Sequence, residues 1–458
     1  TATPVPTPIA YPLITYVGPV AKCEDKGTYI YCVSSTLPLP PETIPAWTSN
    51  RNGYSPEVFC SSDYPLDACG WHLEALETAH SYMGHRNLTE YWVMGHGIEA
   101  RDQLSTVMCD RHAAKGYQTQ EQCEEKNTTP GMHGLETYRA ESEKSITSGE
   151  TNNQAGWNGS RWWGINWYES SIAQGFLTQD NYPDYPFECP DRCSAGVESQ
   201  KTMFHEAFHG AQSSYLATDD FQKRDDLKGP RWWVEGSAEF IAQAYVDKAR
   251  KAGTLRVINA DRTIRATDPE TGLVIDKKNA QGHIIGPELV IREYEFKDNM
   301  RKKLFEYFKN REDTCVGQNL GQYKKCSHME YDAGSWGVAY LNHKVGGFDW
   351  QAFYSDLEAL GWEATFTKHF ERTPEDFYTE FHAWLDTSSW DDRMAILDTE
   401  LPLAIAIPNT DLFTSFSAGG WNASYAIDNG SLFLSSTETP GSKSVGSLNL
   451  DFMPAMLG

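Results

Sequence analysis

The 458-residue chain has no apolar run close to the ~18 residues that a helix needs to cross a bilayer. The longest candidate, LPLAIAIP from Leu401, is too short, so we expect no membrane partner. Positive charge is also scarce, since 39 Lys and Arg stand against 63 Asp and Glu and the formal net charge is −24. An acidic protein is repelled by phosphates, which excludes nucleic acid and anionic membrane surfaces as expected partners.

The chain also lacks a signal-peptide pattern and begins with Thr1 rather than Met, which predicts that a leader has been removed. Cysteine is not lacking. Its even count and close spacing predict local disulfides in an oxidising compartment. The ten cysteines fall into five neighbouring pairs: Cys23 with Cys32, Cys60 with Cys69, Cys109 with Cys123, Cys189 with Cys193, and Cys315 with Cys326. No C-x-x-C motif accompanies Cys189 and Cys193, so a thiolate metal site there is disfavoured.

N-x-S/T triplets agree with a secreted, extracellular glycoprotein, because such acceptors are used on surface loops of secreted chains. There are five of them: Asn87, Asn127, Asn158, Asn422 and Asn429.

Composition along the chain predicts three parts. Residues 1–70 are rich in proline and should form an extended, disulfide-containing arm. This arm either crosses its own domain or adds a strand to a neighbouring subunit. Residues 71–392 carry helical periodicity, and residues 393–458 show short β-like runs that predict a small β unit. The two ends leave open a homo-oligomer or filament.

The segment KTMFHEAFHGAQSSY, from Lys201, contains an H-E-x-x-H motif. On a helix, His205 and His209 lie one turn apart on one face, and Glu206 can lean in from the side. Two such imidazoles can share one zinc ion.

A catalytic zinc site needs a third protein ligand, and Glu235 is the obvious supplier. It lies 26 residues after His209, near the start of a second apolar-periodic segment, WWVEGSAEFIAQAY. Glu239 falls on the same helical face four residues later. It can therefore accept the free ring N–H of a ligand histidine and hold that ring in place.

HEAFH followed by WWVEGSAEF resembles the gluzincin zinc metallopeptidases, and most of all their bacterial collagenase-type members. The resemblance implies an α+β, thermolysin-like catalytic domain that is mainly helical with a small N-lobe sheet. It also implies zinc held by His205, His209 and Glu235, Glu206 as general base, and Glu239 as the partner of a ligand histidine. The G-x-M-E-N motif of the aminopeptidase branch is missing, which favours an endopeptidase acting on proteins or peptides.

MEYDAGSWGVAYLNHKVGG, from Met329, resembles the segment that supplies the transition-state tyrosine in these families. Tyr331 matches that position and could donate a hydrogen bond to the developing oxyanion. His328 and His343 remain alternatives for the same role, as does a purely structural tyrosine.

In the same families, the strand before the zinc helix binds extended substrate, and here Gly164 to Tyr168 would be that strand. Nearby tryptophans could wall the cleft, although core packing is the commoner fate of tryptophan. They are Trp162, Trp163, Trp167, Trp232 and Trp233. Calcium is not indicated, because acidic pairs such as Asp225 with Asp226 read as solvated turns.

These features predict a secreted zinc-dependent endopeptidase. Two alternatives stay open at this stage. One is a zinc hydrolase that does not cleave proteins, and the other is a structural or self-assembling extracellular protein on a metallopeptidase scaffold.

Overall fold

The structure is a computed structural model. It describes residues 15–40, 54–84, 88–95, 97–116, 118–128, 155–160, 165–170, 196–216, 221–256, 263–265, 276–279, 281–287, 289–291, 296–311, 315, 319–322, 326, 328–404, 414–418, 421–428, 431–436 and 446–449. These residues form an α+β fold that is mainly helical, as the sequence predicts. The cysteine pair at 189 and 193 lies outside the described residues.

A six-stranded sheet in the order β1-β2-β3-β4-β6-β5 supports the first half of the chain. Its strands are β1 (Ala21–Asp25), β2 (Tyr29–Ser34), β3 (Glu57–Ser61), β4 (Leu88–Val93), β5 (Ala155–Ser160) and β6 (Ile165–Ser170). The pair β3–β4 and the pair β4–β6 are parallel, and the remaining neighbours are antiparallel. β4 is buried along its whole length, as expected of a strand covered on both faces.

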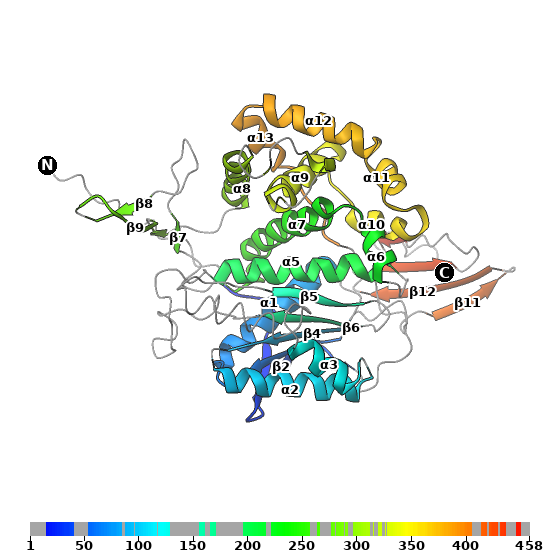
Figure 1. Cartoon of the computed structure of the whole chain (residues 1–458). Helices are drawn as coiled ribbons and strands as arrows, with labels where there is room; N and C mark the ends of the chain where they lie inside the picture. Colours follow the sequence, from blue (N-terminus) through cyan, green and yellow to red (C-terminus); the bar gives the residue numbers. More distant parts are fainter. Residues whose placement is uncertain are drawn as a thin grey trace.

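Helices cover both faces of this sheet (Figure 1). They are α1 (Leu66–Met83), α2 (Ile98–Ala114) and α3 (Gln120–Thr128). Alternation along β4 sends Leu88 and Trp92 toward α2 and α3, and Tyr91 and Val93 into the main core with α1.

A buried ion network fastens α2 to the strands. Arg111 donates to Glu57 and, at 2.7 Å, to Glu90, and His112 Nε2 lies 3.0 Å from Glu90 Oε2. Glu90 and His112 are fully buried, which is tolerated because each of the two side chains has hydrogen-bond partners.

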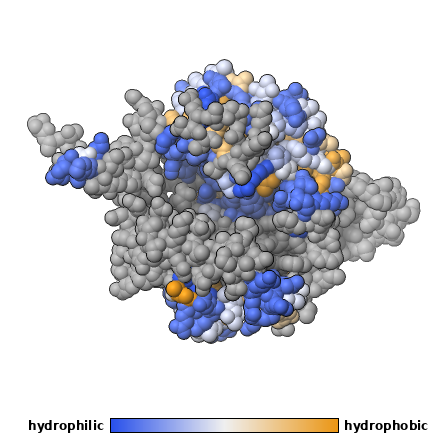
Figure 2. All heavy atoms as spheres, in the orientation of Figure 1, coloured by the Kyte–Doolittle hydropathy of each residue, from blue (hydrophilic) through white to orange (hydrophobic). Residues whose placement is uncertain are grey.

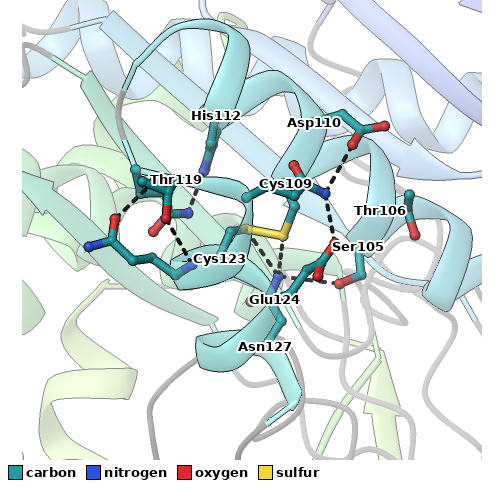
Figure 3. The surroundings of a disulfide bond; sticks show 12 residues. Ser105, Thr106, Cys109, Asp110, His112, Thr119, Cys123, Glu124 and Asn127 are labelled. Atoms are coloured by element: carbon teal, nitrogen blue, oxygen red, sulfur yellow. Dashed lines mark hydrogen bonds between the residues drawn. A yellow bond between two sulfur atoms is a disulfide. The ribbon is translucent and has the colours of Figure 1, made fainter.

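Four of the expected disulfides are present: Cys23–Cys32, Cys60–Cys69, Cys109–Cys123 and Cys315–Cys326. The surroundings of Cys109–Cys123 include one of the five N-x-S/T triplets (Figure 3). Asn127, an N-x-T acceptor, is only 4% exposed. Its amide points at the disulfide and donates to Ser105 Oγ at 3.2 Å. That side chain joins α2 to α3, and its amide is already engaged in these contacts.

The second half of the chain is a stack of helices above β5 (Figure 1). They are α5 (Gly196–Ser214), α6 (Phe221–Lys228), α7 (Arg231–Lys251), α8 (Phe296–Asn310), a 3-10 turn η3 (Leu320–Gln322), a π-helical turn η4 (His328–Ala333), α9 (Gly334–Val345), α10 (Trp350–Leu360), α11 (Trp362–Phe370), α12 (Pro374–Thr387) and α13 (Trp390–Ile396). Thr373 caps α12 by accepting from the Asp376 N–H, with Pro374 in the first turn. Two small ladders pair β7 (Thr263–Arg265) with β10 (Leu289–Ile291), and β8 (Asp276–Lys278) with β9 (Ile284–Pro287).

Trp232 and Trp233 are fully buried and do not wall a cleft. Trp232 stacks on Phe377 at 5.5 Å, and Trp233 packs against Phe353 at 4.7 Å. They anchor the first turn of α7, the helix that carries Glu235, in an aromatic core. Trp162 and Trp163 lie outside the described residues, as does the side chain of Trp167.

The expected substrate strand is also corrected. Ile165 to Tyr168 lie in β6, which pairs with β4 on one side and β5 on the other, and Gly164 is outside the described residues. A strand whose two edges are both paired has no backbone groups left for a peptide. The strand at the end of the sheet, next to α5, is β5.

The domain boundaries expected at residues 70 and 392 fall inside helices. Residue 70 lies within α1, and strands β1 to β3 belong to the same sheet as β4. Residue 392 lies within α13, and Leu401 is still part of the main core. The described part of the arm crosses its own domain, where the Val17 N–H donates to the Gly253 carbonyl at 2.8 Å.

A separate four-stranded antiparallel sheet follows, as the sequence predicts for the C-terminal part. It consists of β11 (Thr414–Ala418), β12 (Trp421–Asp428), β13 (Ser431–Ser436) and β14 (Gly446–Asn449). In the face shown in Figure 2, the coloured residues are mostly hydrophilic, with scattered hydrophobic ones. Among the described helices, none combines the length and apolarity needed to cross a membrane.

Candidate metal centre

His205, His209 and Glu235 meet at one point between α5 and α7. His205 Nε2 and His209 Nε2 are 3.0 Å apart, and each lies 3.3 Å from Glu235 Oε2. Ligand atoms about 2.05 Å from one zinc ion at tetrahedral angles would be about 3.3 Å apart. The separations of the three side-chain atoms are therefore close to those of three ligands around one tetrahedral zinc ion. Within the described residues, this is the one group of three potential metal ligands.

The proton on His205 is fixed by Glu239. His205 Nδ1 lies 3.1 Å from Glu239 Oε2. The Glu239 carboxyl is buried, but the ammonium groups of Lys201 and Lys303 hold its pKa well below its usual range. An ionised carboxylate can only accept, so Nδ1 carries the ring proton and Nε2 presents a lone pair to the centre.

The proton on His209 is fixed by Gln212. The Gln212 amide nitrogen donates to the Val234 carbonyl at 3.0 Å and to the Tyr354 hydroxyl at 2.9 Å. A backbone carbonyl can only accept, which fixes the orientation of the amide. Gln212 Oε1 is then the atom that faces His209 Nδ1, at 2.8 Å, and it must accept the ring proton. His209 Nε2 therefore also presents a lone pair.

Two imidazole lone pairs and one carboxylate oxygen thus converge within 3.3 Å of one another. Such a group is repulsive unless a proton or a metal ion lies between its members. Burial lowers the pKa of His205, but hydrogen bonds to Glu235 and Glu239 outweigh burial and raise it to about 9. Burial would raise the pKa of Glu235, but the neighbouring imidazoles lower it strongly. A proton and a metal ion compete for the same lone pairs, so the residues fit a divalent cation that prefers nitrogen and oxygen ligands.

Close backbone packing sets the position of Glu235. The next residue, Gly236, lies against Gly334 at the start of α9, and a Cβ built on it would stand 2.4 Å from the Gly334 carbonyl carbon. Only glycine permits this approach. α7 is thereby pressed onto the turn η4 that precedes α9.

Tyr331 lies on that π-helical turn, with its ring 6.0 Å from the His205 ring. Burial and the charge of Glu235 raise its pKa, so the phenol stays protonated and can donate a hydrogen bond. Arg231, in the first turn of α7, bonds the neighbouring Glu330 at 3.0 Å and acts on Tyr331 as a hydrogen-bond donor. π-helical turns are rare and are frequent at functional sites.

The other sequence candidates are placed as follows. Glu206 is 8% exposed on α5, and its charge acts on His205. His328 Nδ1 bonds Asp332 Oδ2 at 2.7 Å, and His343 Nδ1 bonds Thr399 Oγ1 at 2.7 Å. Each of these two histidines thus has a partner other than the three candidate ligands at its Nδ1 atom. Asp225 and Asp226 lie in helix α6 rather than in a turn, and Asp225 pairs with Lys228 at 3.2 Å.

Sequence reasoning missed Gln212, Arg231, Lys201 and Lys303. The spacing of two of them could have indicated a role at the site. Gln212 lies three residues after His209, and Arg231 lies four residues before Glu235, so each shares a helix face with a candidate ligand. Lys303 comes from a distant helix, and its spacing gave no such indication.

Comparisons of the chain with protein-family models, with curated proteins and with solved structures found no match. The function therefore rests on the residues of the site.

Proposed function

We propose that this protein is a zinc-dependent peptidase of the thermolysin-like type, and that His205, His209 and Glu235 hold the metal. The observation that carries the proposal is the convergence of three potential ligand atoms, two of them on imidazoles whose opposite ring nitrogens bond Glu239 and Gln212. An ion pair that serves only stability does not require each imidazole to direct its Nε2 atom toward one common point. Three protein ligands, one of them a carboxylate, leave a fourth position open for water.

Bound zinc would supply a water of lowered pKa and polarise a peptide carbonyl. Glu206 follows His205 on α5, is buried, and acts on His205 through its charge. These features support a role for Glu206 as the general base that accepts a proton from that water and delivers it to the leaving amine. Tyr331 stays protonated and its ring lies 6.0 Å from that of His205, which supports donation to an oxyanion.

An extended peptide would bind along β5. This strand ends the sheet, runs antiparallel to β6 and lies against the metal helix α5. Strand addition at such an edge gives a peptide main-chain hydrogen bonds without demanding one sequence. The arrangement favours an endopeptidase, because an extended substrate can continue on both sides of the metal.

Four local disulfides support the further proposal that the enzyme works in an extracellular, oxidising compartment. Assembly through the arm has less support. The described arm packs on its own domain, and strand β1 at the other end of the sheet carries exposed Lys22 and Glu24, charges that discourage strand addition.

The test combines metal analysis with proteolysis. Native mass spectrometry should find one zinc per chain in the wild type and in Glu206→Gln, and no zinc in His205→Ala. Casein and gelatin should be cut by the wild type, with loss in chelator and recovery on added zinc. Glu206→Gln should lose at least about a hundredfold in turnover. Equal cutting by Glu206→Gln and the wild type would refute the general base, and stoichiometric zinc without any peptide cleavage would favour a non-proteolytic hydrolase.

A further inference from the structure

Glu239 receives more donors than the orientation of one histidine requires. Besides His205, its carboxylate accepts from Lys201 Nζ at 3.1 Å, from Lys303 Nζ at 2.8 Å and from Gln243 Nε2 at 2.9 Å. The carboxylate is 3% exposed and each lysine side chain is 18% exposed. One ammonium group would already neutralise it, so the second lysine needs a separate explanation.

The two lysines come from different elements. Lys201 lies on α5, the helix of the ligand histidines, whereas Lys303 lies on α8. Lys303 Nζ also lies 3.4 Å from Asp332 Oδ1 on the turn η4. The other oxygen of Asp332 accepts from His328 Nδ1 at 2.7 Å. The Asp332 carboxylate thus accepts from two donors, Lys303 and His328. Asp332 directly follows Tyr331, the proposed oxyanion donor.

We propose that Lys303 is a positioning residue that ties the metal-binding His205 to the turn carrying Tyr331. The proposal rests on the proposed function. The connection runs from His205 through Glu239 to Lys303 and on to Asp332, with one hydrogen bond or ion pair at each step.

An ammonium group suits this place for a geometric reason. It has three N–H donors on one tetrahedral atom and can serve two carboxylates at once, as a neutral amide of similar length cannot do with equal strength. A π-helical turn is less favourable than an α-helical one and persists where contacts with its surroundings stabilise it. The turn η4 therefore depends on contacts with other elements. Without Lys303, Glu239 would keep Lys201 while Asp332 would lose its link to α7.

Lys303→Met and Lys201→Met form a matched pair, since both remove an ammonium group of equal exposure from the same carboxylate. Lys303→Arg keeps the charge, and Lys309→Met is the exposed control on α8, where the side chain is 61% exposed. Thermal unfolding confirms which variants are folded. Zinc affinity is measured by competition with a chelator, and kcat and KM are measured on a peptide substrate. A fluorotyrosine at position 331 reports the environment of that ring by ¹⁹F NMR, with and without zinc.

We expect Lys303→Met to move or broaden the fluorotyrosine signal and to lower kcat by roughly tenfold or more, as changes behind a metal ligand do. KM should change little, and the loss should disappear when Tyr331 is already Phe. Lys201→Met should weaken zinc binding and leave the fluorine signal in place, while Lys303→Arg should recover most of kcat.

An unmoved fluorine signal in Lys303→Met, or equal behaviour of Lys303→Met and Lys201→Met, would overturn the proposal. The fluorine readout needs no catalysis. If the signal moves in Lys303→Met but the wild type cleaves no peptide, the link between Lys303 and the turn of Tyr331 is supported. The proposed function is then refuted.

Discussion

Gly236 and Gly334 lie backbone against backbone, and this contact sets the distance between the helix that carries Glu235 and the turn that carries Tyr331. A Cβ on Gly334 would meet the Trp232 carbonyl oxygen at 2.6 Å, just as one on Gly236 would meet Gly334. Neither neighbour can move aside, because both are backbone atoms.

Gly236→Ala should therefore separate α7 from η4. Overpacking of this kind costs about 1–3 kcal/mol of unfolding free energy. The shift should also weaken zinc binding, because Glu235 is the adjacent residue. Urea unfolding and chelator competition measure the two effects. Gly337→Ala is the control, since its nearest contact is a movable side-chain atom of Leu320 at 3.0 Å. Equal stability of the two variants would contradict this reading of the contact.

Gln212→Leu should lower zinc affinity by about ten- to a hundredfold while keeping all three ligands. The leucine cannot accept the His209 Nδ1 proton, so the tautomer that presents Nε2 to the metal loses its support. Zinc competition with a chelator measures the change. Gln222→Leu on the exposed face of α6 is the control. Unchanged affinity in Gln212→Leu would mean that His209 holds its tautomer without this amide.

Glu90 should make stability depend on pH in the acid range. Burial raises its pKa, but His112 and Arg111 outweigh burial and lower it to about 2. The ordinary pKa of a glutamate is about 4.3, so this stabilisation is complete above that pH and is lost as pH falls toward 2. Urea unfolding from pH 7 to pH 3 should show the loss in the wild type.

Glu90→Gln should remove most of that pH dependence and destabilise the protein at pH 7. Glu57 shares Arg111 with Glu90, but burial raises its pKa, so it takes up a proton first as pH falls. Glu57→Gln should accordingly cost less at pH 7 than Glu90→Gln. The opposite order of stability would show that Glu57 is the main partner of Arg111.

Asn127 should carry no glycan in the folded protein, because its amide is enclosed by Ser105 and the Cys109–Cys123 disulfide (Figure 3). Peptide mapping by mass spectrometry before and after glycosidase treatment tests this. A glycan mass on the peptide containing Asn127 would contradict the described packing.

The sequence alone determined what depends on spacing within one element. A helical repeat of 3.6 residues puts His205 and His209 on one face whatever the rest of the chain does, and it puts Glu235 and Glu239 on one face of the next helix. The local disulfides and the Thr373 cap were predictable for the same reason, because their partners are close in the chain.

Only the tertiary structure decided which elements meet. That β6 is internal and β5 lies at the edge follows from strand order, which no local pattern encodes. The placement of Lys303 between Glu239 and Asp332 depends on α8 packing beside η4, and the burial of Asn127 depends on α3 folding back onto α2. Such contacts join residues far apart in the chain or on different elements, so they are settled by the packing of whole faces and not by the spacing of a motif.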